Sequence, residues 1–94
     1  MIKQNKSDVT KLYKAILTLE TEEECAAFLG DICTIQELEA LSQRLEVAEK
    51  LIKGGNYIEI NKSIGASTAT ISRVSKYLTY GAGGSRTVVE RLEK

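Results

Sequence analysis

The sequence predicts an all-α fold with about six helices, on three observations. Proline is absent from the 94 residues and aromatic residues make up only 5%, whereas leucine, alanine, glutamate and lysine, which favour helices, are abundant. Hydrophobic residues recur at intervals of three and four, the period of one helix face. Capping residues and glycines divide the chain into segments of helical length. With 43% hydrophobic residues, we expect a single small domain over residues 1–94.

Residues 1–55 are predicted to form three helices that serve dimerisation. The residues expected to cap them are Ser7 or Asp8, Thr21 and Thr34, the last two each followed three residues later by glutamate. Gly54 and Gly55 should end the third helix. The expected apolar faces are Val9, Leu12, Tyr13, Ile16 and Leu17; then Cys25, Phe28, Leu29 and Ile32; then Leu38, Leu41, Leu45, Ala48, Leu51 and Ile52. One small subunit cannot bury all of these faces, so we expect a homodimer.

Residues 56–80 have the pattern of a helix-turn-helix. Asn56, with Glu59 three residues later, should cap the first helix, and Ser67 should cap the second. Gly65 lies where the turn needs a backbone conformation that glycine adopts most easily. The five hydrophobic residues expected to form the core between the helices are Ile60, Ile64, Ala66, Ile71 and Val74. Asn61 departs from the pattern, because many such motifs carry alanine there for close helix contact.

The second helix of this pair is predicted to read double-stranded DNA. Its remaining side chains are small or polar, which suits a helix that enters a major groove roughly 12 Å wide. The candidate DNA-binding residues are Lys62, Ser67, Thr68, Ala69, Thr70, Ser72, Arg73 and Lys76. We expect Thr68, Ala69 and Thr70 to meet base edges, and the cationic side chains to hold phosphates.

Residues 81–94 are predicted to form a glycine hinge and a last short helix. Gly81, Gly83 and Gly84 should break the chain, and Ser85 could cap a helix whose apolar residues are Val88, Val89 and Leu92. The stretch GAGGSR is not expected to bind phosphate, because it follows a helix instead of a strand and lacks the lysine of a P-loop.

Charge and composition limit the classes of function that the chain can have. Positive and negative side chains balance at 13 each, but residues 1–56 carry a net charge of −3 and residues 57–80 a net charge of +2. No segment has the apolar length of a signal peptide or a membrane span, so we expect a cytoplasmic protein without a membrane partner. Without histidine an enzyme is not expected, and Cys25 and Cys33 are expected to be buried free thiols with no metal site.

The run from Thr34 to Leu78 resembles the Trp repressor family, through EALSQR, the long helix ending in KGG, and GASTATISR. The resemblance covers about half of the chain. It implies an intertwined all-helical dimer, two helix-turn-helix heads that read a palindrome, and transcriptional repression, with amino-acid biosynthesis genes as the expected targets.

The resemblance also implies a ligand site between the long helix and the reading helix. In the tryptophan-binding member two arginines enclose the ligand; they correspond to Arg44 and Arg73. A serine of that site corresponds to Tyr77, a glycine to Val74, and of the segment contributed by the partner subunit only Thr34 is kept. Because branched and aromatic side chains should fill the indole slot, we expect a small-molecule corepressor other than tryptophan, or none.

Other interpretations stay open. Two short amphipathic helices around a glycine also form ordinary helix hairpins. The pair could bind a protein instead of DNA, because the total charge is zero and the long helix carries four glutamates, namely Glu37, Glu39, Glu46 and Glu49. Arg44 could equally be a surface arginine paired with glutamates of its own helix.

Overall fold

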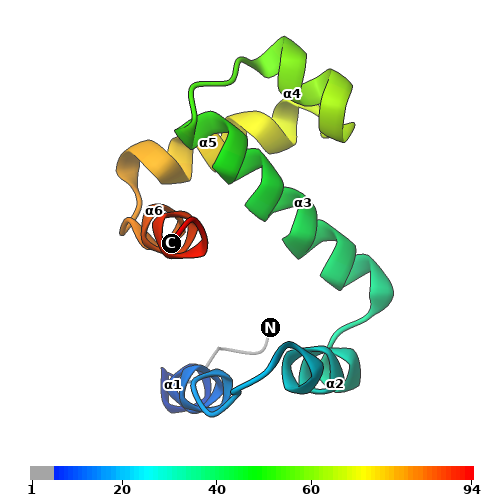
Figure 1. Ribbon diagram of the computed structural model, residues 1–94, viewed down its shortest axis with the longest axis vertical. Helices are drawn as coiled ribbons and strands as arrows, with labels where there is room; N and C mark the ends of the chain where they lie inside the picture. Colours follow the sequence, from blue (N-terminus) through cyan, green and yellow to red (C-terminus); the bar gives the residue numbers. More distant parts are fainter. Residues whose placement is uncertain (1–5) are drawn as a thin grey trace. The chain divides into compact units, whose positions relative to one another are not determined.

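The computed structural model describes the backbone of residues 6–94, and residues 1–5 of the predicted domain lie outside it. The described residues form six helices and no strand, as the sequence predicts (Figure 1). The helices are α1 (Lys6–Ile16), α2 (Glu22–Ile32), α3 (Ile35–Ile52), α4 (Tyr57–Ile64), α5 (Thr68–Tyr80) and α6 (Gly84–Leu92). None of the helices in this described part is long and apolar enough to cross a membrane.

The chain divides into two compact units, residues 1–35 and residues 36–94. The first unit holds α1 and α2. Thr21 caps α2 as predicted, because its Oγ1 accepts a hydrogen bond of 3.1 Å from the backbone N–H of Glu24. The carboxylate of Glu24 accepts from the N–H of Glu20 at 2.8 Å, one residue further back than an ideal capping box. Helix α1 begins at Lys6, slightly before the predicted start.

The hydrophobic core lies in the second unit, where α3, α4 and α5 meet. Its buried residues are Val47, Ala48, Ile60, Ala66, Ile71 and Val74, with Leu51, Ile64 and Leu78 packed against them. The core predicted for the helix-turn-helix is therefore confirmed, although Ile64 is only half-buried. Val47 was not predicted, yet its side chain is fully buried. Helix α3 thus supports α4 and α5 with Val47 and Ala48 from its last two turns.

The connections on both sides of α4 use glycine in the left-handed region. Gly54 follows α3 with φ +92°, and Gly65 ends α4 with φ +82°. Asn56 caps the start of α4 as predicted, its Oδ1 accepting from the N–H of Glu59 at 2.9 Å. These two ends fix the length of α4, which is the first helix of the predicted pair.

Helix α6 starts differently from the prediction. Ser85 is not its cap, because the helix begins at Gly84 and Gly83 occupies the cap position with φ +83°. The left-handed Gly83 makes the turn, so the chain enters the helix two residues earlier than predicted. Val89 is 2% exposed, and the Nζ of Lys53 lies 3.2 Å from Oε1 of Glu93. A buried valine and a surface ion pair are among the contacts that hold α6 in the second unit.

Candidate nucleic-acid interface

Helix α5 has one buried face and one exposed polar face. Ile71 and Val74 are buried against α3 and α4, and their spacing of three residues places them on one side of the helix. The predicted DNA-binding residues on the opposite side are all exposed: Thr68, Ala69, Ser72, Arg73 and Lys76. The core therefore holds α5 so that a continuous row of small, polar and cationic side chains faces solvent.

The first turn of α5 is closed by a side-chain cap. Oγ of Ser67 accepts a hydrogen bond of 3.1 Å from the N–H of Thr70 and donates one of 3.1 Å to the Thr70 hydroxyl. Thr70 is half-buried, unlike its exposed neighbours. The structure thus gives the Thr70 hydroxyl a part in the helix cap, and it leaves Thr68 and Ala69 as the more accessible side chains of this turn.

The exposed face of α5 carries positive charge without a carboxylate. Its sequence TATISRVSKYLTY contains Arg73 and Lys76 and no acidic residue, which makes a net charge of +2. Lys62 adds an exposed cation on α4. Cations near a major-groove helix attract the phosphate backbone, and they suit the predicted positioning role of these three side chains.

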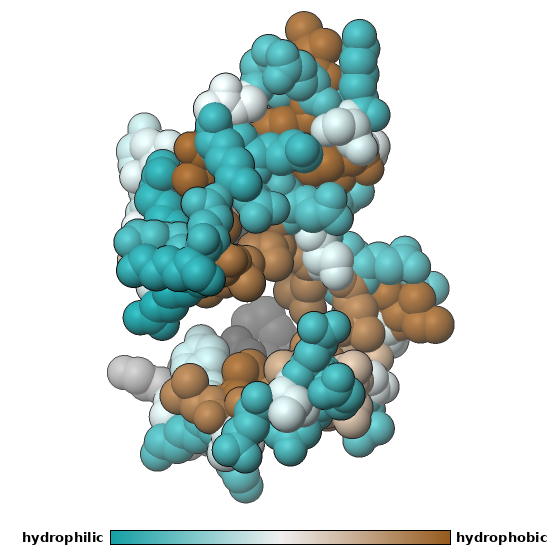
Figure 2. Space-filling model, in the orientation of Figure 1, coloured by the Kyte–Doolittle hydropathy of each residue, from teal (hydrophilic) through white to brown (hydrophobic). Residues whose placement is uncertain are grey.

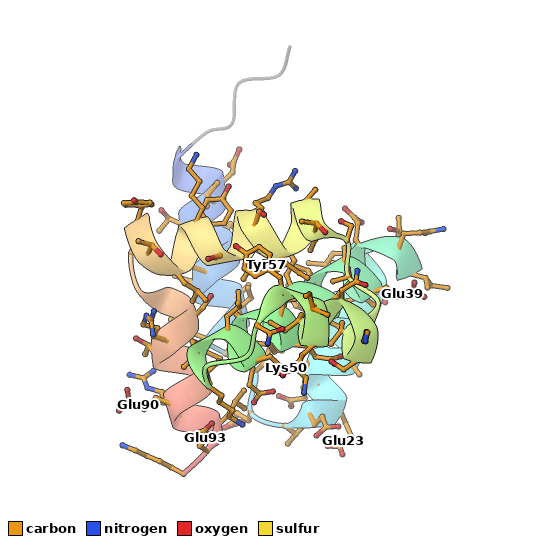
Figure 3. All side chains as sticks on the ribbon, turned by 90° about the horizontal axis from the view of Figure 1, so that it is seen from above. Glu23, Glu39, Lys50, Tyr57, Glu90 and Glu93 are labelled. Atoms are coloured by element: carbon orange, nitrogen blue, oxygen red, sulfur yellow. The ribbon has the colours of Figure 1, made fainter. Side chains whose placement is uncertain are left out.

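A shallow hollow of about 200 Å³ lies where α4 and α5 meet. It is lined by Tyr57, Ile58, Asn61, Lys62 and Thr68. Figure 3 shows Tyr57 at the start of α4, beside α5. The hollow brings the predicted DNA-binding residues Lys62 and Thr68 together and adds Tyr57, Ile58 and Asn61, which sequence reasoning did not place at the interface.

A second pocket, of about 270 Å³, lies between α3, α5 and the start of α6. It is lined by Leu41, Arg44, Leu45, Val74, Tyr77 and Ser85. Two of the four predicted ligand residues, Arg44 and Tyr77, therefore line the same pocket, together with Val74. Val74 is buried and Tyr77 is 66% exposed. The pocket that both line is open, so the expectation that these side chains fill the slot was wrong for this chain.

Two other predicted ligand residues do not line this pocket. Arg73 lies on the exposed face of α5, and Thr34 belongs to the N-terminal unit, directly before α3. Ser85 is an addition that the sequence did not indicate as a pocket residue. Its prediction as a helix cap was wrong, and the early start of α6 instead places it at the pocket wall.

The described residues contain no group of three or more side chains that could hold a metal ion. Cys25 and Cys33 are free thiols, but both are half-buried instead of buried as predicted. The difference arises because the N-terminal unit buries none of its described residues completely.

Two short helices joined by a left-handed glycine, the second with an exposed polar and cationic face, are typical of helix-turn-helix DNA-binding regulators. The model of the Trp repressor protein family matches residues 7–93. The chain belongs to the Trp repressor family. Members of this family are regulators and not enzymes.

Relatives cover nearly the whole chain. The chain is 44% identical over 87 residues to the uncharacterized protein YerC of Bacillus subtilis (strain 168), which covers 93% of this chain and 84% of that protein. The fold of this chain is similar to that in the crystal structure of a protein assigned as a Trp repressor from Staphylococcus aureus. The TM-score is 0.90, and the identity is 43% over 95% of this chain and 89% of that one. A TrpR-like protein from Eubacterium eligens ATCC 27750 gives TM-score 0.89 and 46% identity over 95% and 92% of the two chains. These similarities extend beyond residues 34–78, the run that carries the sequence resemblance.

Proposed function

We propose that this protein is a transcriptional repressor that binds a palindromic operator through α5. The observation that carries the proposal is the arrangement of α5: Ile71 and Val74 lock one face into the core, and the opposite face presents small and cationic side chains without a carboxylate. Such a helix can enter the major groove with little steric obstruction. Family membership supports a DNA-binding regulator.

The side chains divide between readout and positioning. Thr68, Ala69 and Ser72 have short side chains, which allow the helix to approach the base edges closely. The methyl groups of threonine and alanine can contact the thymine methyl. Arg73, Lys76 and Lys62 have the length and charge to reach phosphates. The first group should set which sequence is bound, and the second should set how tightly any DNA is bound.

The proposal includes a homodimer. The N-terminal unit and α3 leave large hydrophobic side chains at least 40% exposed: Leu12, Tyr13, Ile16, Leu17, Ile32, Ile35, Leu41 and Leu45. Figure 2 shows hydrophobic residues in brown among the hydrophilic surface. A second copy of the chain would cover such faces. Two α5 helices would then meet half-sites one helical turn of DNA apart, roughly 34 Å. A stable monomer at micromolar concentration in analytical ultracentrifugation would contradict the dimer.

A small-molecule effector in the second pocket forms a further part of the proposal. Leu41, Leu45 and Val74 offer an apolar wall, while Arg44 and the hydroxyls of Tyr77 and Ser85 offer polar groups. The volume of about 270 Å³ falls just below the roughly 300–1,000 Å³ typical of small-molecule sites. A small carboxylate with an apolar side chain matches these groups, because Arg44 can pair with the carboxylate and Leu41, Leu45 and Val74 can contact the side chain.

The experiment is fluorescence anisotropy on duplex DNA, over a range of salt concentrations. Ser72→Ala should reduce the preference of the protein for its selected sequence over random duplex. Lys76→Ala should weaken both equally and reduce the slope of log K against log salt by about one unit. The reverse pattern would overturn the assignment of readout and positioning.

Thr70→Ala is a separate test, because this residue was predicted to read bases and is also part of the cap of α5. A lower preference for the selected sequence, with the stability of the protein unchanged, would assign Thr70 to readout. A lower stability with an unchanged preference for the selected sequence would show that Thr70 acts only in the helix cap.

The effector is tested by thermal shift against a pool of amino acids and small carboxylates, using Arg44→Gln and, as a control, Arg86→Gln. Arg86 is exposed and does not line the pocket. An effector that raises Tm in the wild type and in Arg86→Gln, but not in Arg44→Gln, would support the pocket. Equal shifts in all three proteins would place the binding elsewhere.

A further inference from the structure

Asn61 holds the turn between α4 and α5 with both its backbone and its side chain. Its carbonyl oxygen accepts a hydrogen bond of 2.9 Å from the N–H of Gly65, as expected at the end of a helix. Its side-chain Nδ2 donates a second hydrogen bond, of 2.7 Å, to the carbonyl oxygen of Ala66. The distance lies at the short end of the range for N–H···O bonds. The position that departs from the usual helix-turn-helix pattern thus makes a specific contact across the turn.

The acceptor of this bond is a buried backbone group. Ala66 is fully buried in the core, and its carbonyl lies directly before Ser67, the cap of α5. A buried carbonyl that loses its partner pays the full penalty of desolvation. The Asn61 amide therefore favours the one orientation of the Ala66 peptide in which the carbonyl points back toward α4.

That orientation determines where α5 begins. The residue after Ala66 is Ser67, whose hydroxyl caps the helix by accepting from the N–H of Thr70 at 3.1 Å. The next two residues are the exposed Thr68 and Ala69. A rotation of the Ala66 peptide would move the Ser67 cap and with it the first turn of α5.

The geometry points to Asn61 as a positioning residue for DNA recognition, which rests on the function proposed above. Its amide fixes the Ala66 carbonyl and thereby sets the angle at which Thr68 and Ala69 face the bases. Asn61 itself carries no charge and adds nothing to the attraction of phosphates. Its contribution is to sequence preference and not to general affinity.

The first experiment uses the protein without DNA and follows amide hydrogen exchange by NMR in Asn61→Ala and Asn61→Asp. Alanine is the better helix former and should keep α4 intact. Ionised aspartate has the same shape as asparagine but cannot donate a hydrogen bond. Both variants should exchange the N–H groups of Gly65 and Thr70 several-fold faster than the wild type. Lys62→Ala, at the neighbouring exposed position, is the matched control and should leave both rates unchanged.

The second experiment compares binding of the selected operator and of random duplex. Asn61→Ala should reduce the ratio of the two affinities by about tenfold, because operator binding must then hold the turn in the orientation that one hydrogen bond holds in the wild type. The salt slope should stay that of the wild type, because no phosphate contact is lost. Lys62→Ala should instead weaken both DNAs and flatten the slope.

The outcomes separate the inference from the function on which it rests. Faster exchange together with a lower ratio supports the positioning role. Unchanged exchange rates in both variants would show that the hydrogen bond from Asn61 to Ala66 does not hold the turn, which overturns the inference. If the affinity ratio still falls, Asn61 contacts DNA directly. Faster exchange with an unchanged ratio shows a turn bond without a role in recognition, which overturns the inference. If the wild type prefers no DNA sequence at all, the proposed function fails. The exchange data still show whether the hydrogen bond from Asn61 to Ala66 holds the turn.

Discussion

Replacing Gly65 with alanine isolates the conformational requirement of the helix-turn-helix. Gly65 has φ +82°, and a Cβ placed on it would meet no atom within 4 Å. The substitution therefore adds no steric clash with neighbours and changes only the backbone preference. A left-handed conformation costs an L-residue roughly 1–2 kcal/mol, and alanine recovers part of that by restricting the unfolded chain, by about 0.4–1 kcal/mol. We expect a net loss of about 1 kcal/mol in the free energy of unfolding, which corresponds to roughly 4–8 °C in Tm for a domain of this size.

Gly84→Ala is the matched control. Gly84 also has open space around a Cβ, but it lies in the first turn of α6 without a positive φ. Alanine there should leave the stability unchanged or raise it by up to about 1 kcal/mol. The assay is urea unfolding followed by circular dichroism at one fixed protein concentration, because the proposed dimerisation would make stability depend on concentration. If Gly65→Ala were as stable as Gly84→Ala, a left-handed turn would not be required. A loss above about 3 kcal/mol would reveal a clash that the structure does not contain.

Three further stability predictions follow from burial, each checked by the same urea titration. Ile71→Ala, at the fully buried centre of the core, should destabilise the protein by about 2–5 kcal/mol, and a loss below about 1 kcal/mol would mean that α5 is not anchored there. Val89→Ala removes the buried side chain of α6 and should lower stability by about 2 kcal/mol, together with faster amide exchange in α6 alone. Lys53→Ala breaks an ion pair with Glu93 in which both side chains are at least half exposed. The free energy of unfolding should therefore change by no more than about 0.5 kcal/mol. A larger loss would show that this surface ion pair contributes to stability.

The six helices were predictable because their signals are local. Thr21, Asn56 and Ser67 each accept a hydrogen bond from the backbone N–H three residues later, and hydroxyl or amide side chains before a polar first turn show this in the sequence. The core of the helix-turn-helix was predictable for the same reason, because Ile60, Ile71 and their partners follow the helical period.

The sequence misled where glycine was taken only as a chain breaker. Gly83 is itself the cap of α6 and Gly84 is the first helical residue, so the helix includes the serine predicted to cap it. Three glycines among four residues look alike in the sequence, and the φ value of each depends on where the two flanking helices pack. The period of the apolar stripe also missed Val47, because α3 contacts more than one neighbour near its end and buries a wider face than one stripe.

Single residues of the candidate site could be predicted from the sequence, but the contacts between them could not. The exposed cations and small residues of α5 can be identified from composition and period alone. The bond from Asn61 to Ala66 depends on the three-dimensional path of the turn, and the asparagine was noticed only as a departure from alanine. The pocket that joins Arg44 to Tyr77 and Ser85 likewise requires residues more than thirty positions apart to meet. Such contacts are set by packing, which no local pattern encodes.

The central claim is that α5 reads a palindromic DNA sequence. The most direct measurement is selection of genome fragments by the purified protein at near-physiological salt, with and without a pool of amino acids and small carboxylates. We predict enrichment of one palindrome whose half-sites lie about one helical turn apart, and a dependence on the pool would reveal the effector. Uniform recovery of all fragments in both conditions, or binding that disappears with modest salt whatever the sequence, would contradict the claim and favour a helical module that binds protein.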